Sequence, residues 1–215
     1  MKTFISFFIF VAWQLCFAAG DTNIIVMSEW SSPIALRNEQ LHEKSIRGRL
    51  MIVQGMEPAY GGPPTTNGAM TFVELQNVTR NESRTCCDDI DVCFDVKNLS
   101  CELLDSTGKA IPKPTAGPWG GRGPFAPSWV KLPYNSTIRL FVNGGTIDPL
   151  TVYPSGAPWI HWSIASNDTN TYLLTGTLNL FTHTNLSIPP EFRKMFCTAT
   201  LEFPKVRITT KQNRQ

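Results

Sequence analysis

Cysteine residues crowd one short stretch of the sequence, and their spacing raises the first chemical question. Cys86, Cys87, Cys93 and Cys101 lie within 16 residues, and Cys197 lies far downstream. Thiolates at this density could hold zinc, but zinc sites normally contain a Cys-x-x-Cys pair or a nearby histidine, and this stretch has neither. Cysteines of an exported chain form disulfides instead. We therefore predict disulfides among these residues with one thiol left over, Cys197 paired to one of the other four, and no metal site.

Aspartates between the cysteines offer a second possible metal site. Asp88, Asp89, Asp91 and Asp95 supply carboxylate oxygens, which calcium prefers as ligands. A calcium loop of the EF-hand type also needs a turn glycine and a bidentate glutamate at fixed offsets, and both are missing here. The spacing therefore favours a solvated acidic loop over a calcium site.

Histidine, serine and glycine patterns supply no catalytic motif. His42, His161 and His183 form no His-Glu-x-x-His pair, and no Gly-x-Ser-x-Gly turn exposes a nucleophilic serine. His161 could act as a base, but the sequence shows no motif that would supply a catalytic partner, so we interpret it as a packed or surface imidazole. The glycine-rich segment 117–124 runs into prolines rather than into a helix, so it does not resemble a phosphate loop. We predict no catalytic residues, no cofactor and a protein that is not an enzyme.

Tryptophan side chains are the candidates for ligand binding. The candidates for an exposed aromatic platform that binds a ligand are Trp119, Trp129, Trp159 and Trp162. Flat aromatic faces bind sugar rings or the side chains of a protein partner. The alternative is that these rings fill the core and the ends of a β-sandwich. The sequence leaves both interpretations open.

Asparagine sequons of the form Asn-x-Ser/Thr are more frequent than the composition gives by chance. They begin at Asn77, Asn81, Asn98, Asn135, Asn167 and Asn185. Several lie at expected strand ends or turns, where an oligosaccharide could be attached. The excess favours glycosylation in a eukaryotic secretory route, whereas in a bacterium the sequons carry no such meaning.

The amino-terminal residues 1–20 predict a cleavable secretory signal. Lys2 precedes an apolar run that ends near Phe17, and small residues follow at 18–20, so we expect the mature chain to begin at Asp21 or Ala19. No later apolar stretch is long enough to span a membrane. The formal net charge of +2 for the whole chain gives no field that would attract nucleic acid. We expect a released protein in an extracellular or periplasmic location, with no nucleic-acid partner.

Alternating apolar residues dominate the chain from residue 45 onward. This period of two predicts strands near 45–53, 69–79, 90–96, 99–104, 135–143, 158–165, 172–181 and 198–208. Loops rich in Gly and Pro follow at 55–68 and 111–133. Residues 21–44 show no clear alternation, and we expect a leader arm there, with a helical turn near 34–44. The expected division is a signal at 1–20, an arm at 21–44, a β domain at 45–210 and a polar tail at 211–215.

Many short strands with Gly/Pro turns and no long helix favour one architecture. We predict an all-β, antiparallel, two-sheet immunoglobulin-like sandwich, and an open β-barrel is the alternative. Four segments carry a family resemblance: FVELQNVT at 72–79, CELLDSTGKAIP at 101–112, SWVKLPYNSTIRL at 128–140 and ATLEFPKVRI at 199–208. Together they resemble uncharacterised exported β-sandwich proteins of planctomycete-type bacteria and, more loosely, the immunoglobulin-like BsuPI proteinase-inhibitor fold. The resemblance spans about residues 45–208 and implies a fold, without catalytic residues to carry over.

These patterns together favour an exported, non-enzymatic binding or structural module. Its partner is expected to be an extracellular protein or glycan. Three alternatives follow in order: a carbohydrate-binding module that uses exposed tryptophans, a protease inhibitor that uses the Pro/Gly loop, and an extracellular hydrolase.

Overall fold

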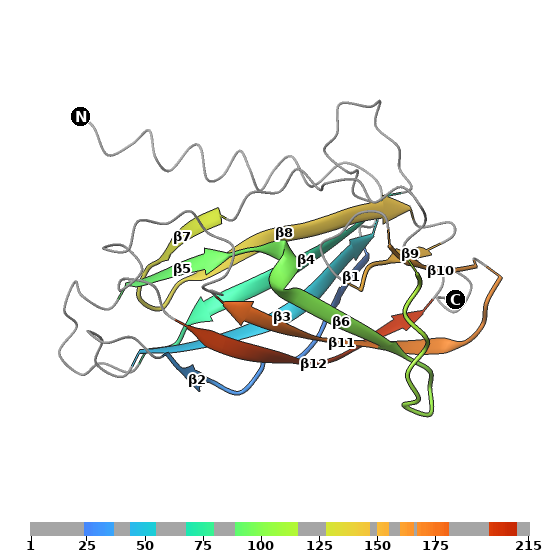
Figure 1. The fold of residues 1–215 in the computed structure, drawn as a ribbon, viewed down its shortest axis with the longest axis horizontal. Helices are drawn as coiled ribbons and strands as arrows, with labels where there is room; N and C mark the ends of the chain where they lie inside the picture. The colour runs from blue at the N-terminus through green and yellow to red at the C-terminus, as the bar shows by residue number, and fades with distance from the viewer. Residues whose placement is uncertain are drawn as a thin grey trace.

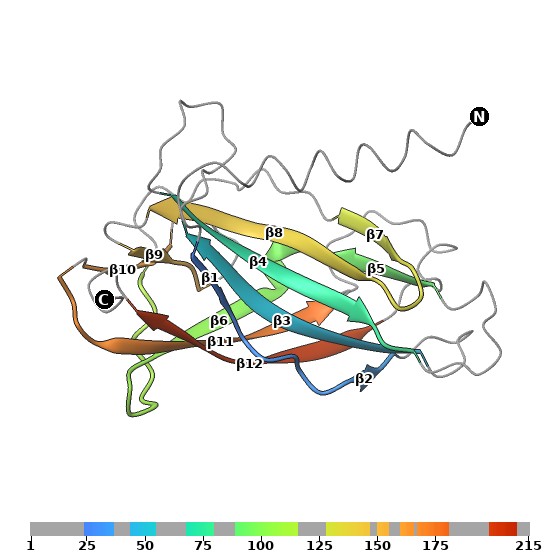
Figure 2. The same ribbon diagram turned by 180° about the vertical axis from the view of Figure 1, so that it is seen from behind.

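Alternation of apolar and polar residues produces strands through nearly all of the described chain. The computed structural model describes residues 24–36, 44–54, 68–79, 89–115, 128–146, 150–154, 160–165, 167–180 and 198–209. These residues form two facing antiparallel sheets, which Figures 1 and 2 show from opposite sides. Neither sheet closes into a barrel. The prediction of an all-β antiparallel sandwich is confirmed.

The first sheet contains five strands and carries the candidate site described below. Its strands are β1 (Ile24–Met27), β2 (Ile34–Ala35), β3 (Ser45–Gln54), β4 (Gly68–Asn77) and β8 (Thr137–Thr146). They lie in the order β1-β3-β4-β8, and β2 also pairs with β3. The second sheet lies in the order β12-β11-β6 and contains β6 (Leu99–Leu104), β11 (Thr171–Leu180) and β12 (Ala199–Thr209).

Two small sheets and one short helix complete the described structure. The strands β5 (Ile90–Phe94) and β7 (Ser128–Leu132) pair at one end of the sandwich, and β9 (Leu150–Val152) pairs with β10 (Trp162–Ile164) at the other end (Figure 1). A single 3-10 turn, η2 (Val96–Asn98), leads from β5 into the second sheet. The strand β7 lies within the expected Pro/Gly loop at 111–133, where it follows Pro127 and pairs on one side only.

The order of the long strands follows the immunoglobulin pattern. That pattern joins the first, second and fifth strands in one sheet and the third, sixth and seventh in the other. Here β3, β4 and β8 are neighbours in the first sheet, and β6, β11 and β12 are neighbours in the second. The chain therefore alternates between the sheets as an immunoglobulin domain does, with β1 and β2 added at the outer edge of β3.

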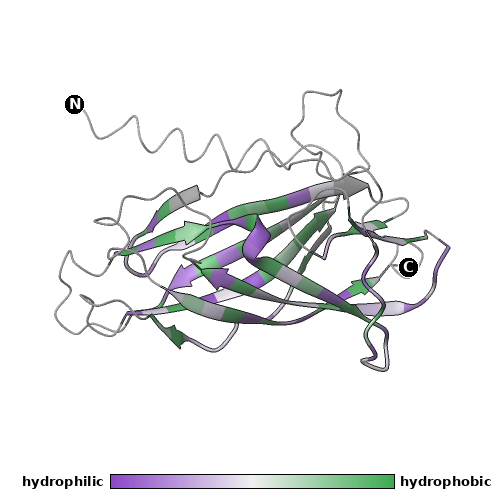
Figure 3. Cartoon of the chain, viewed as in Figure 1, coloured by the Kyte–Doolittle hydropathy of each residue, from purple (hydrophilic) through white to green (hydrophobic). Residues whose placement is uncertain are grey.

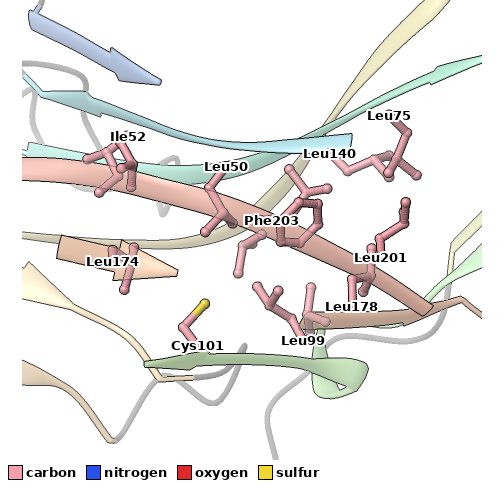
Figure 4. Close-up of a cluster of buried hydrophobic side chains, with 14 of the residues drawn as sticks. Leu50, Ile52, Leu75, Leu99, Cys101, Leu140, Leu174, Leu178, Leu201 and Phe203 are labelled. Atoms are coloured by element: carbon pink, nitrogen blue, oxygen red, sulfur yellow. The ribbon is translucent and has the colours of Figure 1, made fainter. Parts of the chain in front are cut away.

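The core fills the space between the two main sheets, where apolar side chains of alternate positions meet (Figure 4). Figure 3 colours the same strands by hydropathy, with hydrophobic residues in green. The residues labelled in Figure 4 are Leu50, Ile52, Leu75, Leu99, Cys101, Leu140, Leu174, Leu178, Leu201 and Phe203. Gly48 on β3 faces Phe203 on β12, and a Cβ atom at Gly48 would lie only 2.7 Å from the Phe203 ring. This contact fixes which face of β3 points inward, so that Arg47 and Arg49 point outward.

The expected arm at 21–44 is wrong for the residues that the structure describes. β1 and β2 belong to the first sheet, and no helical turn begins at Ile34, because Ile34 pairs with Ile46 of β3. The alternation was missed because the chain between β1 and β2 leaves the regular ladder. Residues 37–43 lie outside the described part of the chain.

Candidate functional site

Charged and aromatic side chains gather on the outer surface of the first sheet. We name Trp30, Arg47, Arg49, Glu74 and Arg139 the arginine–tryptophan face. The cross-strand register places Arg49 of β3 opposite Glu74 of β4, and Glu74 opposite Arg139 of β8. Three adjacent strands therefore present the row Arg49, Glu74 and Arg139 on the side of the sheet that faces away from the core.

Glu74 lies at the centre of this row and accepts ion pairs from both sides. The Nε of Arg49 lies 2.7 Å from Glu74 Oε2, and the Nη2 of Arg139 lies 2.9 Å from Glu74 Oε1. The Glu74 side chain is 5% exposed, whereas those of Arg49 and Arg139 are 23% and 50% exposed. The carboxylate is thus covered by its two partners, and the arginines remain open to solvent. With Arg47, the face carries three guanidinium charges and one carboxylate.

Trp30 reaches this face because the chain bulges between β1 and β2. Ser28 exchanges hydrogen bonds with the backbone of Leu50 (3.0 and 3.1 Å), and Ser31 does so with Gly48 (2.8 and 3.0 Å). Each serine donates through its backbone N–H and accepts through its hydroxyl oxygen. Glu29 and Trp30 therefore both lie opposite Arg49 alone, which is a β-bulge.

The bulge places the Trp30 ring against two guanidinium groups. The Cζ atom of Arg47 lies 4.8 Å from the ring centroid, and that of Arg49 lies 4.4 Å from it. Arg47 and Arg49 lie two residues apart on β3, and both guanidinium groups make a cation–π contact with the same ring. The Nε of Arg47 also donates to Gln76 Oε1 at 2.7 Å. Within the described residues, the terminal Nη groups of Arg47 and Arg49 have no hydrogen-bond or ion-pair partner.

Apolar side chains continue the outer surface beside the arginine row. Phe72 of β4 and Phe141 of β8 pack edge to face with centroids 5.8 Å apart, and Arg139 lies over Phe72. Met27 of β1 is 45% exposed, which is unusual for a large apolar side chain in this chain. Trp30, Phe72 and Phe141 are half-buried, and Met27 and Arg139 are exposed. A partly exposed surface of Arg, Trp, Phe and Met resembles the centre of a protein interface, where these residue types are enriched. Guanidinium forks additionally match the oxygen pairs of carboxylates.

Of the four tryptophans predicted as a platform, the structure describes one side chain, that of Trp162, and it does not lie on this face. Trp162 is buried, and its indole N–H donates to the carbonyl oxygen of Pro112 at 2.9 Å, so it cannot offer a flat exposed surface. Its placement in the platform is wrong, because its ring belongs to the core. The backbone of Trp129 lies in β7 opposite Cys93, while its side chain is outside the description. Trp119 and Trp159 lie outside the described residues.

Two predicted disulfide partners are free thiols. Cys93 and Cys101 are buried, and neither lies at bonding distance from another cysteine, so their assignment to disulfides is wrong. Cys101 packs in the core against Gly176, where its Sγ lies 3.1 Å from the position of an added Cβ. Burial raises the pKa of the Cys101 thiol to about 12, and burial with the charge of Asp95 raises the pKa of Cys93 to about 11. Cys86, Cys87 and Cys197 lie outside the described residues.

Two of the aspartates near these cysteines accept hydrogen bonds from backbone N–H groups. Asp95 is buried and accepts from the backbone N–H of Lys97 at 2.9 Å, which caps η2. Asp89 accepts from the backbone N–H of Tyr134 at 3.1 Å and lies 3.4 Å from the Lys131 ammonium. Asp91 is half-buried on β5, and Asp88 lies outside the described residues. Asp89 and Asp95 therefore join structural elements.

His161 is exposed next to Tyr153, with ring centroids 5.7 Å apart. The Tyr153 hydroxyl donates to the carbonyl oxygen of Gly144 at 3.1 Å, and burial raises the pKa of that hydroxyl. His42 and His183 lie outside the described residues.

One sequon is closed to glycosylation. The Asn77 side chain is fully buried, and its Nδ2 donates to the carbonyl oxygen of Leu132 at 3.2 Å. A glycan on this nitrogen has no space, so the prediction for Asn77 is wrong. Among the other sequons, Asn135 and Asn167 are exposed and Asn98 is half-buried. Asn81 and Asn185 lie outside the described residues.

Sequence reasoning missed the arginine–tryptophan face. A usable signal was present, because Arg47 and Arg49 occupy the polar positions of a predicted strand.

Comparison with protein-family models, with curated proteins and with solved structures finds no match for this chain. In the described part of the chain, no helix has the length and apolar character needed to cross a membrane.

Proposed function

We propose that this chain is an exported, non-enzymatic binding module whose arginine–tryptophan face contacts the partner. The observation that carries the proposal is the outward array of Trp30, Arg47, Arg49 and Arg139 around the covered carboxylate of Glu74. Arg and Trp are the residues that contribute most binding energy in protein interfaces. The sandwich supports this role, because a rigid sheet holds the donors in place before a partner arrives.

A structural role alone explains only part of the array. The ion pairs of Glu74 join three strands, and such pairs stabilise a sheet. Trp30 and Arg47 make no ion pair with Glu74, yet a bulge with two serine anchors brings Trp30 to Arg47 and Arg49. A bulge that aims a side chain outward is common beside functional surfaces.

A capture experiment with matched variants tests the proposal. The exported chain is immobilised, exposed to the extracellular fraction of the cells that produce it, and the retained components are quantified. We expect a component that wild type retains and the Arg47→Gln/Arg139→Gln variant loses. The Arg207→Gln variant is the control, because it removes an exposed guanidinium from β12 of the second sheet. Equal retention by all three proteins contradicts the proposal.

A further inference from the structure

The spacing of the arginines restricts the kind of partner that fits this face. Arg47 and Arg49 lie two residues apart on β3, which sets their Cα atoms about 6.7 Å apart. Alternate side chains of any other extended polypeptide have the same separation. Carboxylates at every second position of an extended segment can therefore meet Arg47 and Arg49 in register.

The charges and hydrogen-bond donors complement such a segment. Three arginines surround one carboxylate, so the face has an excess of positive charge within the described residues. Both oxygens of Glu74 accept arginine Nε groups, and Oε1 also contacts the Nη2 of Arg139. Within the described residues, the Nη groups of Arg47 and Arg49 stay available as donors. A bidentate pair with a carboxylate uses parallel donors of this type.

The apolar residues beside the arginines favour a polypeptide over an acidic polysaccharide. Phe72, Phe141 and Met27 extend the surface with aromatic and thioether groups, and two guanidinium groups already contact the Trp30 ring. The outward positions of β3, β4 and β8 hold Arg and Phe together with Glu74 and Gln76, the methionines Met51 and Met70 on these strands are buried, and these three strands contain no lysine. Interface centres of protein complexes have this composition.

We propose that the arginine–tryptophan face binds an extended acidic polypeptide segment that carries carboxylates at alternate positions. This inference rests on the proposed function, and it names the partner class of the same surface. Recognition of acidic motifs by arginine clusters is a known mode of peptide binding. The polypeptide lies over β3 and β4, with its carboxylates on Arg47, Arg49 and Arg139 and its intervening side chains against the apolar residues.

The test uses two synthetic peptides of one composition and different charge patterns. The alternating peptide repeats the dipeptide Glu-Thr, and the block peptide places all of the same glutamates before all of the same threonines. Affinities for the exported chain are measured by calorimetry at low and moderate salt. We expect the alternating peptide to bind more tightly than the block peptide, and added salt to weaken the binding of both.

Variants of Arg47 distinguish bidentate recognition by a guanidinium group from simple attraction by a positive charge. Arg47→Gln should weaken binding of the alternating peptide about tenfold, and Arg47→Lys should restore only part of it, because lysine keeps the charge and loses the fork. Arg207→Gln is the control on the second sheet and should leave the affinity unchanged. Melting curves confirm that each variant is folded; Arg47 takes part in no ion pair within the described residues, so we expect little change.

Polygalacturonate serves as the competing polyanion. Tighter binding of this glycan than of the alternating peptide, equal affinity for the two peptides, equal loss in Arg47→Gln and Arg207→Gln, or no peptide binding would each overturn the inference. The proposed function then still stands if capture of a natural component depends on Arg47 and Arg139. It fails separately if that capture is the same in all variants.

Discussion

At the scale of single residues, Glu74 decides how the arginine–tryptophan face is held together. Its carboxylate is covered, and its two partners are on neighbouring strands. Removing the charge leaves Arg49 and Arg139 facing each other without an anion. Burial strengthens this interaction, while the exposure of both arginines weakens it through solvent screening.

The substitution Glu74→Gln should therefore lower the free energy of unfolding by about 1–2 kcal/mol, between the values for exposed and buried pairs. Denaturant titration at neutral pH measures this change. Glu102→Gln, on an exposed position of β6, is the matched control and should change stability by less than about 0.5 kcal/mol. A loss no larger than that of the control would show that the Glu74 network has no role in stability.

The two described cysteines should be unreactive in the folded protein. Alkylation requires the thiolate, and burial raises the pKa of Cys101 to about 12 and that of Cys93 to about 11. At pH 8, site-resolved mass spectrometry should find both thiols unlabelled by iodoacetamide until denaturant is added. Recovery of either residue in a disulfide, or rapid labelling of the native protein, would contradict this. A bridge from Cys197 to Cys86 or Cys87 stays a prediction.

At the scale of elements, the contact between β3 and β12 depends on the absence of a side chain at Gly48. A Cβ atom there would lie 2.7 Å from the Phe203 ring and 3.3 Å from a carbonyl oxygen of Glu74. Gly48→Ala should destabilise the protein by about 1–3 kcal/mol through overpacking. The double variant Gly48→Ala/Phe203→Leu should lose less stability than the sum of the losses of the two single variants. Strict additivity in thermal melts would argue against the contact.

The start of β11 contains a hydrogen bond that resembles the tyrosine corner of immunoglobulin domains. The Tyr172 hydroxyl donates to Asp168 Oδ2 at 2.6 Å, where the immunoglobulin motif uses a backbone acceptor. This bond lowers the pKa of Asp168 and raises that of Tyr172. A lowered carboxyl pKa contributes stability above its unfolded value near about 4 and loses it as the pH falls through the folded value.

Tyr172→Phe should consequently lower the free energy of unfolding by about 1 kcal/mol at pH 6–8, a small value because the pair is near the surface. The difference from wild type should begin to shrink as the pH falls below about 4, because the unfolded chains then bind a proton that folded wild type, with its lowered Asp168 pKa, binds only at lower pH. Denaturant titrations from pH 3 to 8 measure it. A difference that stays constant to pH 3 would mean that the carboxylate is not the acceptor that matters.

Strand alternation predicted β3, β4, β6, β8, β11 and β12 because each of these strands buries one face. The same rule could not find β1 and β2. Their ladder is interrupted by the bulge at Glu29 and Trp30, and serine hydroxyls replace part of the expected backbone pattern. The candidate site was missed for the same reason, since Trp30 meets Arg47 and Arg49 only through long-range pairing of β1 with β3.

At the scale of the whole molecule, the inner faces of the sandwich stabilise the fold and the outer face of the first sheet carries the candidate binding site. The inner faces form the core, and the outer face of the first sheet carries arginines and aromatic rings that are partly open to solvent. The immunoglobulin-like strand order brings β3, β4 and β8 together, although β5, β6 and β7 lie between β4 and β8 in the sequence. The fold class and most of the long strands could be predicted from periodicity, whereas β1 and β2 could not. The register that assembles Arg49, Glu74 and Arg139 is a property of the complete sheet.

Hydroxyl-radical footprinting of the exported chain, alone and with its captured partner, tests the binding face most directly. Radical oxidation of Met27 and Trp30 reports the exposure of the arginine–tryptophan face and its border. Tyr134, 39% exposed in the turn between β7 and β8, is the internal control. We expect the partner to protect Met27 and Trp30 severalfold and to leave the oxidation of Tyr134 unchanged. Unchanged oxidation of Met27 and Trp30, with protection elsewhere on the bound chain, would contradict it.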